Sequence, residues 1–179
     1  MRAALGAALT VAALATACTA DEEDPPPAAP DASTGVGVAW SPCDGLTAAQ
    51  VGRLVGEQMI EQTGTAEEPR CTFTPAAEGG PAFDVSYLWF DGSLNEALDA
   101  MGSASARLRP ATVDGADAAR LAVRERASGV LVTGFVQTRG LVQSVNAVQL
   151  KPYTSAQVVA GTVGLLEALV RAAPDSPPE

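Results

Sequence analysis

The sequence predicts an α+β domain with a mainly antiparallel sheet, about three helices and one disulfide, in the order α-β-β-α-β-β-β-β-α. Three observations predict this class: helix-start patterns, strands that alternate apolar with polar residues, and short glycine-containing turns between strands. The helices stand before, between and after groups of consecutive strands and do not alternate with single strands. That order favours an antiparallel sheet with the helices packed on one face.

Each predicted helix begins with a capping box, in which a Ser or Thr and a Gln or Glu three residues later bond reciprocally to the backbone. The pairs are Thr47 and Gln50, Ser93 and Glu96, and Thr154 and Gln157. The helices are predicted over residues 48–60, from the Ser93 cap to about residue 105, and over residues 155–172. Glu167 and Arg171 interrupt the apolar run of the last helix, which indicates a helix laid across the sheet and not a membrane span.

Six strands are predicted between the helices, at residues 70–74, 83–90, 112–113, 120–125, 130–137 and 141–150. Residues 83–90 show the clearest alternation, because Phe83 and Val85 share one face while Asp84 and Ser86 share the other. The last two strands are joined by Thr138-Arg139-Gly140, which suits a hairpin loop with glycine at a positive φ. The Asp114-Gly115 pair predicts another turn.

The N-terminus is typical of an export signal. Met1 and Arg2 precede an uncharged, small-to-apolar run over residues 3–17, which is shorter than the roughly twenty residues of a spanning helix. Ala15-Thr16-Ala17-Cys18 resembles a bacterial lipobox, with Ala15 where the pattern prefers Leu, Val or Ile. We therefore expect a signal peptide at 1–17 and a lipid anchor, including palmitate, on Cys18. The alternative is ordinary cleavage and simple secretion.

Residues 18–37 combine an acidic run with several prolines and have no apolar periodicity. They predict a disordered tether between the lipid and a globular domain at residues 38–173, followed by a disordered tail at 174–179. The expected location is the outer face of the cytoplasmic membrane. The membrane, reached through the lipid, is the first predicted partner.

Composition excludes several classes of function. The formal net charge of −10 disfavours nucleic acid as a partner, because nucleic-acid binding normally needs a basic surface. The chain has no histidine, which excludes a Ser-His-Asp triad and imidazole zinc sites. No catalytic constellation is recognisable, and we expect no metal, no cofactor and no enzymatic activity.

Cys43 and Cys71 remain once Cys18 is assigned to lipidation. An exported domain folds under oxidising conditions, so the two are predicted to form a disulfide. A two-cysteine metal or redox site is disfavoured, because the spacing is not Cys-x-x-Cys and no histidine supplies further ligands.

Residues 41–51 read Ser-Pro-Cys-Asp-Gly-Leu-Thr-Ala-Ala-Gln-Val, and Cys71 stands two residues before Phe73. This arrangement resembles a family of actinobacterial secreted lipoproteins of unknown function, which open with Pro-Cys-x-x-Leu-Thr and later carry a cysteine two residues before an aromatic residue. Residues 113–119 also resemble that family's glycine-rich turn. Ser41 and Phe73 depart from the family's usual Asp and Trp. The resemblance covers about residues 40–173 and implies an envelope location without an established activity.

Candidate ligand-binding side chains fall into three groups. An arginine row along one strand could hold an anionic group, polar residues in the last strand could line a pocket, and aromatic residues could form an apolar cleft. The residues are Arg120, Arg124 and Arg126; Gln143 and Asn146, with Ser144 between them; and Tyr87 and Trp89, with Phe90. For the first two groups the alternative is a solvated strand face. For the aromatic residues it is packing against the last helix.

The leading hypothesis is therefore a non-catalytic module that binds an envelope protein or a small apolar or anionic ligand. Two alternatives stay open. One is an enzyme acting on cell-wall glycan through Asp114 and a second acid, although Asp before Gly is a common turn residue. The other is a structural or assembly subunit of an envelope complex.

Overall fold

The computed structural model describes residues 40–65, 68–102 and 107–177, which all belong to one compact unit. The predicted signal peptide at 1–17, Cys18 and the tether at 18–37 lie outside the described residues. The elements are α1 (Pro42–Gly45), α2 (Ala48–Val55), β1 (Met59–Thr63), β2 (Arg70–Pro75), β3 (Ala82–Trp89), α3 (Leu94–Ala100), β4 (Arg109–Pro110), β5 (Ala118–Glu125), β6 (Gly129–Thr138), β7 (Leu141–Leu150) and α4 (Ser155–Ala172).

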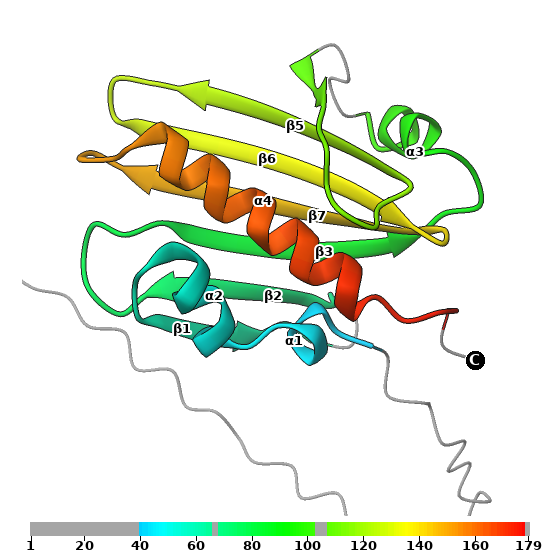
Figure 1. Ribbon diagram of the computed structural model, residues 1–179, viewed down its shortest axis with the longest axis horizontal. Helices are drawn as coiled ribbons and strands as arrows, with labels where there is room; N and C mark the ends of the chain where they lie inside the picture. Colours follow the sequence, from blue (N-terminus) through cyan, green and yellow to red (C-terminus); the bar gives the residue numbers. More distant parts are fainter. Residues whose placement is uncertain (1–39, 66–67, 103–106, 178–179) are drawn as a thin grey trace, which may run out of the picture. The chain divides into compact units, whose positions relative to one another are not determined.

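The seven strands form one antiparallel sheet in the order β1-β2-β3-β7-β6-β5-β4 (Figure 1). Two meanders make it up, β1 to β3 and β4 to β7, and they join where β3 pairs with β7. The α+β class and the antiparallel sheet are confirmed. The hairpin of β6 and β7 also forms as predicted, with Arg139 at φ 51° and Gly140 at φ 80° in its turn.

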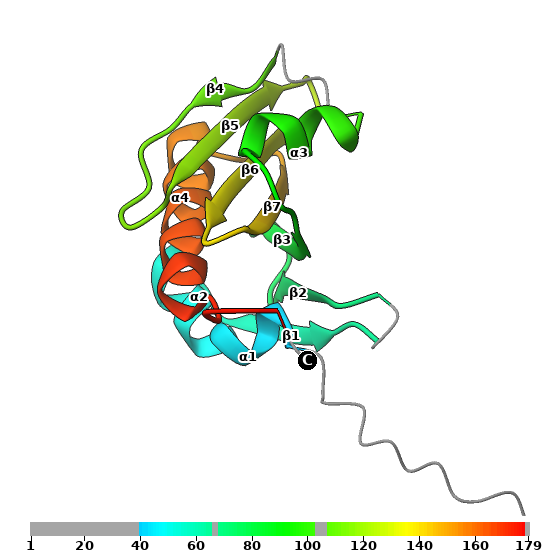
Figure 2. The same cartoon turned by 90° about the vertical axis from the view of Figure 1, so that its right-hand side faces the viewer.

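The helices lie on both faces of the sheet, which corrects the prediction that they all share one. Helices α1, α2 and α4 cover one face, and α3 lies on the other, towards one end of the strands (Figure 2). The main core lies under α4 and includes Phe83, Val85, Val145, Leu165 and Leu169. A smaller core under α3 contains Leu94, Ala97, Leu98, Phe135 and Val142. No helix among the described residues therefore covers most of the face opposite α4.

Helix α4 runs over the residues predicted for it and crosses the middle of the sheet. It is long and apolar enough to cross a membrane by length and composition alone. Its apolar side chains are used in the core, however, since Leu165, Leu166 and Leu169 are fully buried. Gly134 of β6 lets the helix approach closely, because a Cβ atom there would lie 2.8 Å from Cδ1 of Leu166.

The first predicted helix is too long. Helix α2 ends at Val55 because Gly56 adopts a left-handed conformation at φ 78°, which favours glycine and ends the helix. The chain then turns into β1, an element that the sequence analysis missed. Met59 keeps a buried apolar position, but it does so in a strand and not in a fourth helical turn.

Helix α1 was also missed, because a four-residue helix is too short to show periodicity. It places Cys43 beside Cys71 of β2, and the two sulfur atoms are bonded. The predicted disulfide is therefore confirmed. It ties the first helix of the domain to the second strand of the sheet.

Two of the three predicted capping boxes are confirmed, at Thr47 and at Ser93. Thr154 makes no side-chain cap on α4, so the third was wrong.

The strand expected at residues 112–113 is also wrong, because the partner of β5 is the two-residue β4, at Arg109 and Pro110. The turn expected at Asp114 and Gly115 is present, with Gly115 at φ 80°.

The cap of α3 makes stability depend on pH. The Glu96 carboxylate accepts bonds from the backbone and the hydroxyl of Ser93, and these bonds lower its pKa below the ordinary value of 4.5. The stabilisation is therefore present above that pH and is lost as the pH falls through the lowered folded-state pKa. We expect Glu96→Gln to remove this component when urea unfolding is followed between pH 7 and pH 3. An unchanged pH dependence in the variant would contradict the assignment.

Candidate functional site: the open face of the sheet

Polar side chains line the part of the sheet face opposite α4 that α3 does not cover. We call this surface the open face and define it by the six of them that pair across neighbouring strands, Thr72, Asp84, Ser86, Thr133, Ser144 and Asn146. They are joined in pairs across neighbouring strands: Thr72 to Asp84 at 3.1 Å, Ser86 to Ser144 at 2.8 Å, and Thr133 to Asn146 at 3.0 Å. These pairs span four adjacent strands from β2 to β6.

The open face is suited to hydrogen bonding. Its hydroxyl and amide groups can both donate and accept, and Asp84 is its single carboxylate. Ser144 pairs with Ser86 and not with Lys151. Lys151 is the only lysine in the sequence and lies beyond the end of β7. Among the described residues of this face, no serine bonds to a basic side chain and no second carboxylate faces Asp84. The six side chains therefore offer hydrogen-bonding contacts.

The three arginines from the sequence analysis lie on the same side of the sheet as the open face, but they differ in their contacts. Arg120 is partly buried and donates to the Asn95 side chain at 3.0 Å and to the Ala119 carbonyl at 2.9 Å. It is therefore engaged with α3. Arg124 and Arg126 are exposed farther along, at the end of β5 and in the turn that follows.

Gln143 and Asn146 lie on opposite faces of β7, so they do not form one site. Asn146 is exposed on the open face, whereas Gln143 is fully buried under α4. The Gln143 amide donates to the Leu169 carbonyl at 3.3 Å, in the last turn of α4. Carbonyls there have no partner within their own helix. Gln143 therefore ties the helix end to the sheet, which corrects its assignment to a ligand site.

We expect Gln143→Met to lower the free energy of unfolding by about 1–2 kcal/mol, because the Leu169 carbonyl would be buried without a donor. Urea denaturation measures this. The matched control is Asn146→Met in the same strand, for which a change within about 0.5 kcal/mol is expected at an exposed position. Equal stability of the two variants would show that the buried amide bond contributes nothing.

Tyr87 and Trp89 lie on the helix-covered side, whereas Phe90 packs in the smaller core on the other side. Tyr87 donates its hydroxyl to the Trp40 carbonyl at 2.6 Å, and the two rings meet edge to face at 4.9 Å. Burial, with the nearby Asp44 carboxylate, raises the pKa of Tyr87 above 10.0. The Tyr87 contacts with Trp40 hold the start of the domain, and the structure does not bring Tyr87, Trp89 and Phe90 together as a ligand cleft.

The acids considered for catalysis lie in turns. Asp117 accepts the backbone N–H of Arg139 at 2.8 Å and so links the start of β5 to the β6–β7 turn. Asp114 is exposed in the turn before Gly115. Glu61 lies near both cysteines, but the sulfur atoms are bonded to each other, and Glu61 accepts the Ala48 N–H at 2.9 Å. It holds the start of α2.

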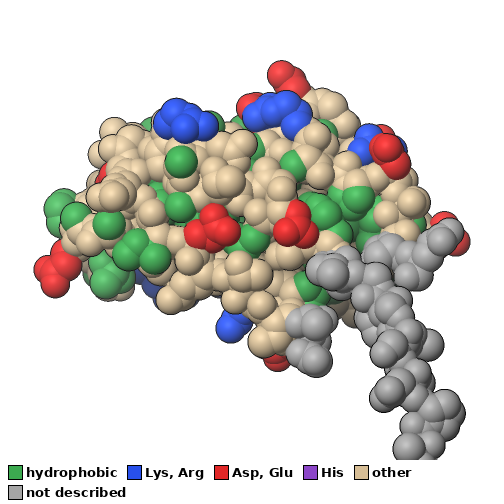
Figure 3. Space-filling view, turned by 90° about the horizontal axis from the view of Figure 1, so that it is seen from below, with side chains coloured by type: hydrophobic (Ala, Val, Ile, Leu, Met, Phe, Trp, Pro, Cys, Tyr) green, Lys and Arg blue, Asp and Glu red, His purple; other side chains and the backbone are tan. Residues whose placement is uncertain are grey.

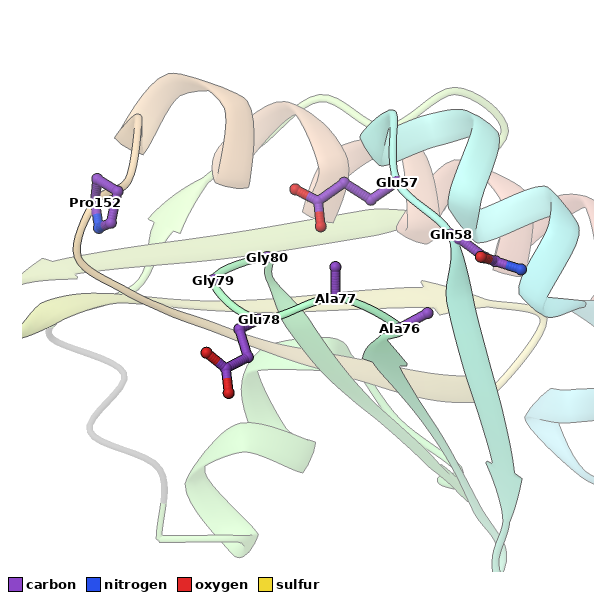
Figure 4. Close-up of a pocket in the computed structure, with 8 residues that line it drawn as sticks. All are labelled: Glu57, Gln58, Ala76, Ala77, Glu78, Gly79, Gly80 and Pro152. Carbon is purple, nitrogen blue, oxygen red and sulfur yellow. The ribbon is translucent and has the colours of Figure 1, made fainter.

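One pocket lies between the end of α2 and the turn that joins β2 to β3 (Figure 4). Its volume is about 610 Å³, and residues 57–58, 76–80 and 152 line it. The Glu57 carboxylate points towards Gly80, where a Cβ atom would collide with it. Glu57 and Glu78 make this pocket acidic, so it is unsuited to an anionic ligand.

A second pocket, also of about 610 Å³, lies on the open-face side of the same turn. Pro75, Ala82, Val148 and Leu150 give it an apolar floor, and Glu78 and Lys151 also line it. It is thus continuous with the open face.

The face seen along the β1 edge shows acidic, basic and hydrophobic side chains interspersed, without a large surface of one charge (Figure 3).

Asn146 and Ser144 were predicted from the sequence as candidate ligand-binding residues, whereas the other polar members of the open face were not. Asp84 and Ser86 were identified only as the polar side of a strand. Strict alternation of faces in residues 141–150 would have separated Gln143 from Asn146. Comparison with protein-family models finds no match, and comparisons with curated proteins and with solved structures find none either.

Proposed function

We propose that this chain is a non-catalytic recognition module, held outside the cytoplasmic membrane by a lipid on Cys18, and that the open face contacts its partner. The observation that carries the proposal is the line of paired polar side chains across β2, β3, β7 and β6, which no described helix covers. Serine, threonine and asparagine provide adaptable hydrogen bonding at binding surfaces.

An envelope protein is the partner class that this surface favours. The open face has no aromatic side chain among its six members, whereas nucleobase recognition commonly uses aromatic stacking. Its hydroxyl and amide groups suit the polar part of a protein interface, and the exposed apolar side chain of Ile60 lies on the same side.

The anchor is tested by the intact mass of the protein extracted from its source membranes without reductant. The expected mass starts at Cys18, includes acyl groups, and is two hydrogens short because of the disulfide. An unmodified chain recovered from the medium would replace anchoring with secretion.

The binding face is tested by photo-crosslinking in intact cells. A crosslinking amino acid placed at Asn146 or Thr133 should capture the same protein. The control position is Gln157, which is exposed on α4. Capture from the control position at equal yield, or from none of the three positions, would contradict recognition through the open face.

A further inference from the structure

An apolar strip crosses the open-face side of the sheet at the end away from α3. Val148 pairs directly with Ala82 on one side and with Leu131 on the other, so the three side chains form one row. Leu150 extends the row along β7. Val148 is 44% exposed and Leu150 is 65% exposed, although both are large apolar residues in the longest strands. Together these four residues are the apolar strip.

Three cations surround the same end of the sheet. Arg124 pairs with Leu131 in register, so it lies directly beside the apolar strip. Arg126 and Lys151 both border the β5–β6 turn: the Arg126 N–H bonds to Gly129 at 2.8 Å, and the Lys151 N–H bonds to Ser128 at 3.1 Å. We call these three residues the basic corner. All three are exposed, in a chain whose formal net charge is −10.

The acids near the basic corner leave it an excess of positive charge. Glu125 pairs with the buried Val130, so strand alternation directs it to the helix-covered side. Glu78 lines the second pocket together with Lys151. That pocket, of about 610 Å³, falls within the range of about 300–1,000 Å³ that small-molecule sites occupy. Its apolar floor of Ala82, Val148 and Leu150 leads to the basic corner.

We propose that this region binds an anionic phospholipid, with an acyl chain along the apolar strip and the phosphate held by Arg124, Arg126 and Lys151. Apolar surface beside clustered cations is complementary to a molecule that is apolar at one end and negatively charged at the other.

The inference rests on the proposed function for one point, the location at a membrane surface. Residues 18–40, if fully extended, reach at most about 75 Å, which exceeds the roughly 33 Å length of β7. The anchor therefore permits this end of the domain to contact the bilayer.

The test uses the full chain purified in detergent and native mass spectrometry with added dioleoylphosphatidylglycerol or dioleoylphosphatidylcholine. We expect the anionic lipid to bind in preference to the zwitterionic one. The variant R124Q/R126Q/K151Q should weaken its binding by about a hundredfold, or about fivefold for each cation removed. Val148→Asp should also weaken it, by placing a carboxylate on the apolar strip.

The matched control is R53Q/R107Q/R171Q, which removes three exposed cations elsewhere and should leave binding unchanged. Thermal unfolding of every variant separates loss of binding from loss of folding. Equal binding of the two lipids, equal weakening by the control, or full displacement by inorganic phosphate would overturn the proposal. None of these outcomes changes the mass at Cys18 or the crosslink at Asn146, so the proposed function can survive this failure.

Discussion

Replacing Cys43 and Cys71 together by alanine should lower the free energy of unfolding by about 3–4 kcal/mol. The disulfide joins residues 28 apart in the chain. A cross-link that closes a loop of this length lowers the entropy of the unfolded chain, which destabilises the unfolded state by about 3.6 kcal/mol. Cys71 is fully buried in β2, and Cys43 lies in a helix of only four residues. Without the bond, α1 keeps its packing through the buried Pro42 and the close approach of Gly45 to Ala172, but it loses its covalent link to β2. Urea denaturation at pH 7 measures the difference.

Thr63→Ala is the control for this prediction. The Thr63 hydroxyl lies 3.4 Å from the Cys43 sulfur, but Thr63 is exposed at the edge strand, so a change within about 0.5 kcal/mol is expected. Reduction of the wild-type protein should reproduce the loss seen in the alanine variant. If the double alanine variant unfolds at the wild-type urea concentration, the disulfide does not stabilise the domain.

Leu166→Ala should lower the free energy of unfolding by about 2–5 kcal/mol, because it leaves a cavity between α4 and the sheet. Leu166 is fully buried, and its Cδ1 atom is the nearest atom to a Cβ placed on Gly134. Gly134→Ala alone should cost about 1–3 kcal/mol by overpacking the same contact. In the double variant the new methyl group occupies part of the cavity. We therefore expect the double variant to lose at least about 0.5 kcal/mol less than the sum of the two single losses.

The control for this cycle is Val123→Ala in β5, where the side chain is 43% exposed and a change of about 0.5 kcal/mol is expected. Urea denaturation of all the variants under one condition gives the coupling energy. Strict additivity of Leu166→Ala and Gly134→Ala would show that the sheet and helix do not share this contact in solution.

The fold class could be predicted because its signals are local. Residues 130–137 and 141–150 alternate between faces, and the Arg139-Gly140 pair supplies the positive φ angles of their turn. The errors arose where one residue overrides a periodic pattern. Gly56 ends α2 although the apolar spacing continues to Met59, so the first two residues of β1 were read as helix.

The open face could be predicted only in part, because it depends on which strands are neighbours. Alternation alone places Asp84 and Ser86 on one side of β3. Nothing in the local sequence indicates that Ser86 lies opposite Ser144, which is 58 residues away. The apolar strip depends on the same long-range pairing, since Ala82 meets Val148 only once β3 and β7 are side by side.

The joining of two meanders between β3 and β7 also has a kinetic consequence. Within each meander the paired strands are neighbours in the chain, so they can form after short loops close. Pairing β3 with β7 closes a much longer loop, because Ser86 and its partner Ser144 are 58 residues apart in the chain. Closing this longer loop costs more conformational entropy than closing the short loops within a meander. The two halves are therefore expected to gain structure before they meet, and the alignment of β3 with β7 is expected to limit the folding rate.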